Sequence, residues 1–342
     1  MSKQYDKIVF IGRFQPFHNQ HFETVKRALD LADEVIIAIG SVNRSPNIKD
    51  PWCFSERMDM IISNFDKEQA SRIKFVPIKD HLYNDTRWAT RVVQAVSEHI
   101  KFNDRVGLIG ANKDESSFYL NLFPGFDRVP TDHVIGIDAT NIRNKIFSNA
   151  FDLYAQPLPA QTKFWIDAWV ESNRDEFERL CAEFSFIRRY HRSWETAPYP
   201  PTFVTVDAVV TCGDHILLVE RKAAPGEGLW ALPGGFVDQK ERLVAACIRE
   251  LREETRLKVP EAVLRNRIAR QQVFDHPARS LRGRTLTHAF HIPLEDTILP
   301  KVKGGDDAAR AFWVPMAEVV ANQNRMYEDH AFIIEEFTGI NL

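Results

Sequence analysis

The stretch Gly235–Leu257 reads GFVDQKERLVAACIRELREETRL, and the second half of the chain is organised around it. A glycine pair and an apolar run precede it, so its residues predict a turn and then a helix. At about 100° per residue, the carboxylates of Glu250, Glu253 and Glu254 fall on one side of that helix. Another side, which we expect to pack against a core, carries an apolar set: Val244, Ile248 and Leu251.

Three carboxylates on one side of a helix repel one another, which costs stability unless a positive charge lies between them. Oxygen ligands of this kind suit Mg²⁺ or Mn²⁺. A solvated acidic helix face is the alternative interpretation. The complete spacing of Gly235, Glu241, Arg249-Glu250 and Glu253-Glu254 favours a metal site over that alternative.

This pattern resembles the box of the Nudix hydrolases, which cleave nucleoside diphosphates linked to another group. The resemblance implies that Glu250 and Glu254 are metal ligands, with Glu253 close to them. Glu241 is then a ligand or a group that supports one. Arg249 is expected to orient the carboxylates through an ion pair.

Arg256 stands where the family has Gly, and Gly there favours a left-handed helix end. The substitution leaves the shape of that helix end open and permits a hydrolytic activity that is weakened or lost. The box does not fix the catalytic base. Asp306 and Asp307, on a Gly-rich loop, are candidates, and an ordinary acidic turn is the alternative.

Length and composition set outer limits. A chain of 342 residues with 44% hydrophobic residues predicts two domains with buried cores. A net charge of −3 gives no reason to expect nucleic acid or an anionic membrane as a partner. The 4 cysteines show no CxxC spacing, which favours reduced thiols in a cytoplasmic protein. No signal peptide and no membrane-spanning run is recognised.

The first half begins with strand, turn, helix and strand, the βαβ pattern of a parallel sheet. Strands are predicted over Lys7–Ile11 and Val35–Gly40, with a helix over about residues 20–32 between them. Ligands of such sheets bind beyond the carboxyl ends of the strands, where the intervening turn would lie. His18 and His21 share one side of the helix start there, and we interpret them as phosphate-binding groups.

A second anion site is predicted after another strand, Val106–Gly110. In the segment Asp138–Arg143, Thr140 is expected to cap a new helix, and Arg143 follows three residues later. A plain helix cap beside a surface Arg is the alternative for this segment alone.

Together these segments resemble the nucleotidyltransferases with an HxGH-type signature, and most closely the archaeal-type nicotinamide mononucleotide (NMN) adenylyltransferases. GRFQPFH, residues 12–18, carries most of the resemblance. Gln20 replaces the Gly of the first signature. Asp138 and Ala139 replace the serines of the second, ISSTxIR. The resemblance covers about residues 5–155.

The resemblance implies an ATP site and an NMN site. The residues it assigns to ATP are Gly12, Arg13, Phe14, His18, His21, Lys113, Thr140 and Arg143. Asn84 would bind the carboxamide of NMN, and Trp88 would stack on its cationic ring, with ordinary core packing as the alternative for Trp88. The expected chemistry is direct phosphoryl transfer with Mg²⁺, which requires positioning and positive donors but no protein nucleophile.

A helical segment is expected over about residues 161–189, and three prolines in Trp194–Pro201 predict a stiff linker. We therefore expect a Rossmann-like nucleotidyltransferase domain over residues 1–190, a linker over 191–201 and a Nudix α/β/α sandwich over 202–342. Homo-oligomerisation is left open.

The run from Asp207 to about Asp329 resembles the Nudix members that cleave ADP-ribose to AMP and ribose 5-phosphate. The segments that carry this resemblance are WALPGGFVD, FDHPARSLRGRT and VKGGDDA. Arg279 and Arg284, with Arg282 between them, are expected to grip the diphosphate, and a solvated basic loop is the alternative.

The sequence thus predicts a cytoplasmic enzyme with two activities, which makes NAD from NMN and ATP and hydrolyses ADP-ribose with Mg²⁺ or Mn²⁺. One alternative keeps the first activity and makes the second half a sensor that binds ADP-ribose without cleaving it. A transcriptional regulator is a second alternative, against which the lack of a basic helix-turn-helix segment argues.

Overall fold

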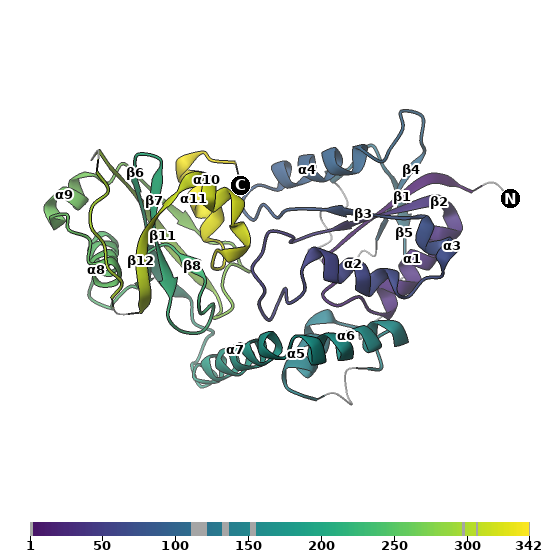
Figure 1. Cartoon of the computed structure of the whole chain (residues 1–342), viewed down its shortest axis with the longest axis horizontal. Helices are drawn as coiled ribbons and strands as arrows, with labels where there is room; N and C mark the ends of the chain where they lie inside the picture. Colours follow the sequence, from purple (N-terminus) through teal and green to yellow (C-terminus); the bar gives the residue numbers. More distant parts are fainter. Residues whose placement is uncertain are drawn as a thin grey trace. The chain divides into compact units, whose positions relative to one another are not determined.

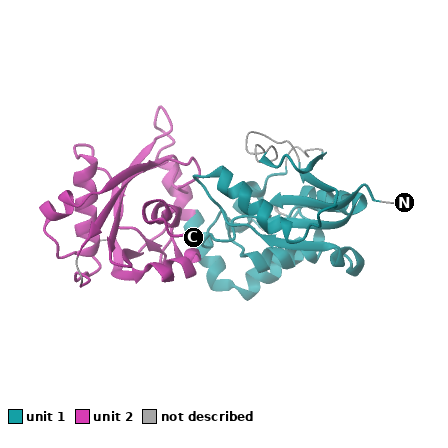
Figure 2. Ribbon diagram, turned by 90° about the horizontal axis from the view of Figure 1, so that it is seen from above, with its two compact units in different colours: residues 1–184 teal, residues 185–342 magenta. Residues whose placement is uncertain are grey.

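The computed structural model describes residues 3–110, 122–131, 137–150, 155–295, 298–305 and 307–341. The chain forms two compact units, Met1–Phe184 and Ser185–Leu342, which Figure 2 shows in different colours. The division falls inside helix α7 (Arg174–Arg192), and residue 190, where we expect the first domain to end, lies in the same helix. Each unit has hydrophobic clusters of its own.

The first unit is built on a 5-stranded sheet of order β3-β2-β1-β4-β5, in which every pair of neighbours is parallel (Figure 1). This is the sheet that the βαβ pattern predicts. Its strands are β1 (Tyr5–Gly12), β2 (Ala32–Ile39), β3 (Ile73–Pro77), β4 (Val106–Gly110) and β5 (Asp127–Pro130).

Both faces of this sheet are covered because successive residues of its strands point to opposite sides. Along β1, Ile8 and Phe10 pack into one cluster, and Val9 and Ile11 pack into another. The helices of the unit are α1 (Asn19–Leu31), α2 (Phe54–Ile62), α3 (Lys67–Ser71), α4 (Asp85–Ser97), α5 (Ala139–Phe147), α6 (Ala160–Ser172) and α7.

The helix expected over about residues 161–189 is two helices, α6 and α7. Asn173 ends α6, because its backbone N–H and its side-chain Nδ2 both donate to the carbonyl of Trp169, at 2.9 and 3.0 Å. A polar residue that bonds back to the preceding turn offers the backbone an alternative to further helix.

The second unit contains a 7-stranded mixed sheet with the path β10-β11-β6-β7-β12, to which β8 and β9 are added. β11 and β6 run parallel, and the other pairs are antiparallel. The strands are β6 (Phe203–Cys212), β7 (His215–Arg221), β8 (Trp230–Ala231), β9 (Gly234–Phe236), β10 (Arg270–Phe274), β11 (Thr285–Leu294) and β12 (Ala308–Pro315).

Two helices cover opposite faces of this mixed sheet. On one face lies α8 (Leu243–Thr255), and Val206 and Ala208 of β6 pack against its apolar side. On the other face lies α11 (His330–Thr338), and Val209 of β6 packs into the same cluster as that helix. The remaining helices are α9 (Glu261–Asn266), α10 (Met316–Ala321) and the 3₁₀ turn η3 (Gln323–Arg325). The expected α/β/α sandwich is therefore confirmed.

The four cysteines Cys53, Cys181, Cys212 and Cys247 are free thiols, as their spacing predicts. Within the described parts of the chain, no helix combines the length and the apolar character that a membrane span requires.

Candidate active sites

Gly12 and Phe14 together determine the backbone shape of the turn after β1. Phe14 is 1% exposed and has a left-handed φ of 54°. Its ring lies so close to Gly12 that a Cβ there would approach the ring to 2.8 Å. Gly12 is therefore required for this close packing, which directs the following residues to the start of α1.

The two histidines meet at the start of α1. His18 is the N-terminal cap residue, and its ring stacks on the ring of His21 with a centroid distance of 3.6 Å and an interplanar angle of 17°. The His18 backbone N–H donates to Nδ1 of His21 at 3.4 Å. The rings of Phe14 and Phe17 lie 4.9 and 5.8 Å from that of His21, so aromatic packing holds the pair in place.

A pocket of about 260 Å³ lies at this end of the sheet. It brings together seven of the eight residues assigned to ATP, namely Gly12, Arg13, Phe14, His18, His21, Thr140 and Arg143. Lys113, the eighth, lies outside the described residues. The start of α5 also lines the pocket, so its backbone N–H groups lie there together with the two histidines.

Arg143 is buried, and its guanidinium is tied to the protein itself. It donates to the carbonyl oxygens of Gln15 and, at 3.1 Å, of Ile48, and to Oγ1 of Thr140 at 3.2 Å. Burial lowers the pKa of Arg143 to about 10. Arg143 therefore shapes the pocket by holding the Gln15 turn, in addition to presenting charge to it.

The cap of α5 differs from the sequence prediction. Asp138, not Thr140, is the cap residue, because its carboxylate accepts the backbone N–H of Thr140 at 3.0 Å. Asp side chains favour this bond two residues ahead. The hydroxyl of Thr140 instead accepts from Arg143.

Asn84 immediately precedes α4 and Trp88 lies on it, and both are absent from the described residues that line this pocket. The Asn84 side chain caps α4 by accepting the backbone N–H of Arg87 at 2.8 Å. Trp88 is half-buried against the cluster of α4, with its ring 6.1 Å from that of Phe123. Their assignment to NMN stays a prediction.

Three further buried residues, to which the sequence assigns no individual role, also hold this site. Arg57 is 1% exposed and donates to the carbonyls of Arg13 and Gly40 at 2.8 and 2.7 Å. Gln15 exchanges two hydrogen bonds with the backbone of Trp52. Asp50 lies 3.8 Å from Nη1 of Arg13. Their partners are distant in sequence, so no local pattern signals them.

In the second unit, the guanidinium of Arg249 lies among the acids of α8. It bonds to Glu241 at 2.9 Å, Glu250 at 2.8 Å and Glu253 at 3.0 Å, which is the expected ion pairing. The bond to Arg249 lowers the pKa of Glu241. The positive charge that this acidic side requires is thus part of the protein.

Glu254 is buried against the glycine pair. Its Oε2 accepts the backbone N–H of Gly234 at 3.0 Å. Burial, together with the charges of Glu250 and Asp207, raises the pKa of Glu254 to about 8 and outweighs the opposing effect of the Gly234 bond. A Cβ on Gly235 would lie 2.6 Å from the Glu250 carboxyl carbon. Both glycines are therefore places where carboxylates approach the backbone.

The donor set fits a hard divalent cation, since these groups are oxygen ligands with excess negative charge around Glu254. In the conformation described, no three His, Cys, Asp or Glu side chains in the described parts are grouped closely enough to hold an ion. Arg249 explains this, because it holds oxygens of Glu241, Glu250 and Glu253.

Arg256 ends α8 in the left-handed conformation, with φ 48° and ψ 32°. Its backbone N–H donates to the carbonyl of Arg252 at 2.9 Å. The helix end is therefore formed without Gly, and the helix that carries the acids is not distorted.

A small pocket of about 40 Å³ opens onto Glu254 and the glycine pair. From the basic loop it receives Arg279 and Arg282, but Arg284 is not among its described lining residues. The Arg284 side chain is exposed and donates to the carbonyl of Asp275. Asp307 lines the pocket, and Asp306 lies outside the described residues.

Arg279 is only 4% exposed and is held by Asp329 through two hydrogen bonds of 2.9 Å. The Arg282 guanidinium lies over the ring of Phe236, 4.8 Å from its centroid. One arginine of the basic loop is thus paired inside the protein, and the other is placed on an aromatic face at the pocket.

Comparison with known proteins gives a matching family for each unit. The NUDIX domain family matches residues 201–337, and the cytidylyltransferase-like family matches residues 9–120. The nicotinamide/nicotinic acid mononucleotide adenylyltransferase of Acinetobacter baylyi is 46% identical over 154 residues, which are 43% of this chain and 81% of that protein. The ADP-ribose pyrophosphatase of Methanocaldococcus jannaschii is 34% identical over 134 residues, 39% of this chain and 72% of that protein.

Two solved structures match both units together. A bifunctional NMN adenylyltransferase/ADP ribose pyrophosphatase from Francisella tularensis has a TM-score of 0.92 at 36% identity and covers 98% of this chain and 99% of its own. The second, a bifunctional protein of the same description and source complexed with AMP and Mn, has a TM-score of 0.89 at 34% identity, again with 98% and 99% covered. Because the similarity extends over both units and both candidate sites, the chain belongs to the family of bifunctional NMN adenylyltransferase/ADP ribose pyrophosphatases.

Proposed function

We propose that the first unit transfers the adenylyl group of ATP to NMN, giving NAD and pyrophosphate, and that the second hydrolyses ADP-ribose to AMP and ribose 5-phosphate. One observation carries this proposal: a solved bifunctional protein matches the chain over nearly its whole length. The pocket at the start of α1 and the acid cluster of α8 supply the groups that each reaction needs.

In the first reaction, an oxygen of the NMN 5′-phosphate attacks the α-phosphorus of ATP, and the bond to pyrophosphate breaks. The protein forms no covalent bond. His18 and His21 donate to phosphate oxygens beside the N–H groups at the starts of α1 and α5, where negative charge builds up. Arg13, whose side chain is half-exposed, adds a positive charge, and Arg143 keeps the turn that carries these groups in place.

In the second reaction, water attacks a phosphorus of the diphosphate, and the bond between the two phosphates breaks. Glu250, Glu253 and Glu254 would hold divalent cations, which polarise a phosphate and activate water when bound. Arg282 lies at the pocket beside Glu254, and we propose that it binds a phosphate there. We propose Mg²⁺ as the cation in both units, because phosphate substrates and carboxylates are its usual ligands.

We also propose a cytoplasmic location, since free thiols such as the exposed Cys53 persist in reducing compartments. Small molecules are the proposed partners, namely ATP, NMN and ADP-ribose. Nucleic acid and membrane are not proposed as partners.

The test is an assay of the purified chain with both substrate sets and Mg²⁺. NAD formation from NMN and ATP, together with AMP release from ADP-ribose, supports the proposal. Binding of ADP-ribose without release of AMP would instead support the sensor alternative. That alternative rested on Arg256, whose left-handed conformation leaves α8 intact.

A further inference from the structure

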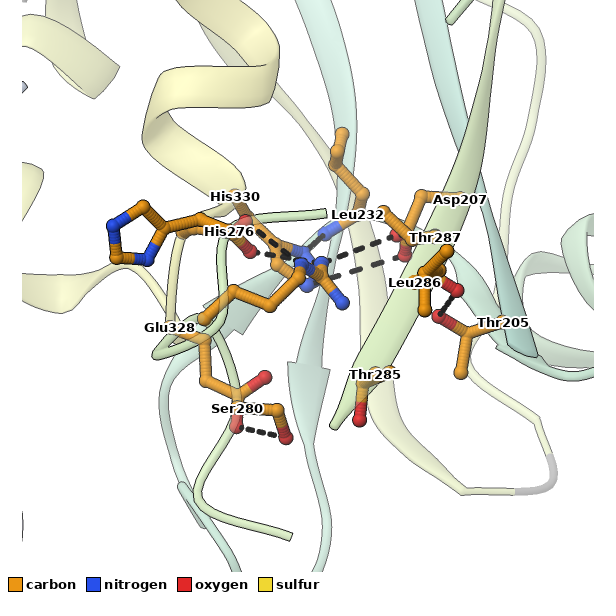
Figure 3. A network of polar contacts seen from close by, with 12 residues as sticks. Thr205, Asp207, Leu232, His276, Ser280, Thr285, Leu286, Thr287, Glu328 and His330 are labelled. Carbon is orange, nitrogen blue, oxygen red and sulfur yellow. Dashed lines mark hydrogen bonds and ion pairs between the residues drawn. The ribbon is translucent and has the colours of Figure 1, made fainter. Parts of the chain in front are cut away.

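Figure 3 shows a network of polar side chains around Asp207 and His330. Asp207 belongs to β6, which pairs with β9, the strand that carries Gly234. Asp207 on β6 and Asp329 before α11 are 5% and 0% exposed, and His330 is 6% exposed. Removing charges from water is costly unless they are paired, so such a cluster has a cost that a purely apolar core would not have. None of these three side chains has a place in the chemistry described above.

Asp207 is held by two other elements. Its Oδ2 accepts the hydroxyl of Thr287 on β11 at 2.5 Å and lies 4.0 Å from the guanidinium of Arg279. In the pairing of β6 with β9, Asp207 stands opposite Gly234. A Cβ on Gly234 would lie 2.6 Å from Oδ1 of Asp207, so the carboxylate packs directly against that backbone.

His330 connects the network to the same segment from the other side. Its Nδ1 accepts the backbone N–H of Leu232 at 2.8 Å. A neutral ring that accepts at Nδ1 carries its proton on Nε2. That nitrogen faces Oδ1 of Asp207 at 3.9 Å (Figure 3).

The segment Leu232–Gly234 is therefore bonded on two sides. His330 holds the N–H of Leu232, and the N–H of Gly234 donates to Oε2 of Glu254. Between them, the carbonyl of Pro233 accepts the N–H of Ala208 on β6 at 2.8 Å. The direction of the Gly234 N–H, and with it the place of the Glu254 carboxylate, depends on how this segment is held.

We propose that Asp207 and His330 are positioning residues for the hydrolysis, which fix the segment Leu232–Gly234 and through it the Glu254 carboxylate. This inference rests on the proposed function of the second unit. Residues that support metal ligands in this way typically change metal affinity or activity by about 10- to 100-fold when they are replaced.

The test compares two variants of His330 in the full chain. His330→Phe removes the acceptor of the Leu232 N–H, whereas His330→Asn can supply an amide oxygen as acceptor. Binding of Mn²⁺ alone, without nucleotide, is measured by electron paramagnetic resonance, with Glu254→Gln as the reference for a lost ligand. We expect His330→Phe to weaken Mn²⁺ binding about 10-fold or more and to lower kcat more than it raises KM, and His330→Asn to restore most of both.

A second variant covers the case in which His330→Phe does not fold. Asp207→Asn keeps an oxygen for Thr287 but removes the charge, and we expect it to weaken Mn²⁺ binding in the same direction. Adenylyl transfer by the same chain and a thermal melt report on folding. Folded variants that bind Mn²⁺ and hydrolyse ADP-ribose within twofold of the wild type would overturn the inference.

The two proposals fail differently. A wild-type chain that binds Mn²⁺ but releases no AMP from ADP-ribose would refute the hydrolytic function. The comparison of Mn²⁺ affinities among the variants would still decide whether Asp207 and His330 position Glu254.

Discussion

Arg256 has a backbone conformation that residues other than Gly, Asn and Asp seldom adopt. Its φ of 48° ends α8, and its guanidinium lies against Gly305, where a Cβ would be 2.9 Å from its Nε. The backbone strain at this single residue is therefore offset by the contacts around it. Phe14 is a second example, since its φ of 54° is tolerated because its ring is fully packed.

Replacing Arg256 with Gly should stabilise the second unit by about 1 kcal/mol, because Gly adopts the left-handed conformation without strain. For a unit of this size the melting temperature should rise by about 2–4 °C. Arg252→Gly is the matched control, because Arg252 lies inside α8 whereas Arg256 lies at its end. This variant should lower the melting temperature, since Gly inside a helix costs about 1 kcal/mol. Equal shifts for both variants would contradict the strain assigned to Arg256.

His21 and Glu254 should separate the two activities. His21→Ala should lower NAD formation by about 100-fold or more, since it removes a donor to developing charge. ADP-ribose hydrolysis in that variant should stay within twofold of the wild type. Glu254→Gln should produce the opposite pattern. Steady-state assays of both reactions on each variant test this, and a loss of both activities in either one would argue against separate sites.

At the scale of elements, β9 is the strand on which the hydrolytic site depends. It pairs with β6 and packs against α8, so the two glycines at its start lie between a backbone and two carboxylates. A Cβ on Gly234 would lie 2.1 Å from the carbonyl oxygen of Val206, which is part of a strand and cannot yield cheaply. A Cβ on Gly235 would meet only the end of the Glu250 side chain.

Replacement of the two glycines by Ala should therefore have different consequences. Gly234→Ala should destabilise the second unit by about 2–3 kcal/mol, a range typical of overpacking. Gly235→Ala should leave the melting temperature within about 2 °C but lower hydrolysis, because the Glu250 carboxyl must move. Thermal melts and ADP-ribose assays of both variants distinguish these cases. Equal destabilisation by the two changes would count against this account of β9.

The elements that the sequence predicts best are those with a strong local pattern. An apolar run predicts β1, and a helical repeat of apolar residues predicts α1 and α8. The spacing of the glutamates alone predicts that they lie on one side of α8. The prediction that Thr140 caps α5 is wrong, because Asp138 and Thr140 are both good cap residues and only the folded backbone selects one.

Contacts between distant parts of the chain could not be predicted. Arg57 reaches the turn at Arg13, and Arg279 pairs with Asp329, fifty residues away. In the sequence Arg279 is indistinguishable from Arg282 and Arg284, yet the fold buries the first, places the second at the pocket and exposes the third. Burial decides these roles, and burial is a property of the complete unit.

At the scale of the whole molecule, each unit carries its own clusters of buried residues and its own candidate site. The two reactions concern the same dinucleotide chemistry, since one forms a diphosphate linkage to adenosine and the other breaks one. Their requirements differ, because the first pocket presents imidazoles and arginines and the second presents acids.

Removal of divalent cations should therefore affect activity far more than folding. EDTA in excess should abolish ADP-ribose hydrolysis, and Mg²⁺ or Mn²⁺ in excess over the chelator should restore it fully. The melting temperature of the chelated protein, measured by calorimetry, should show both units still folded. Hydrolysis that persists after exhaustive chelation would refute the metal assignment.

Arg249 gives this last expectation its physical basis. With its guanidinium bonded to three glutamates, the acid cluster has an internal counterion and does not depend on an external one to limit self-repulsion. In a cell short of divalent metals, the hydrolase would then stay folded but inactive, and it would regain activity when the metal concentration rises. For a metal ion to bind the acid cluster, Arg249 would have to release carboxylate oxygens of the glutamates. The metal concentration needed for activity would then depend on this competition between Arg249 and the metal ion.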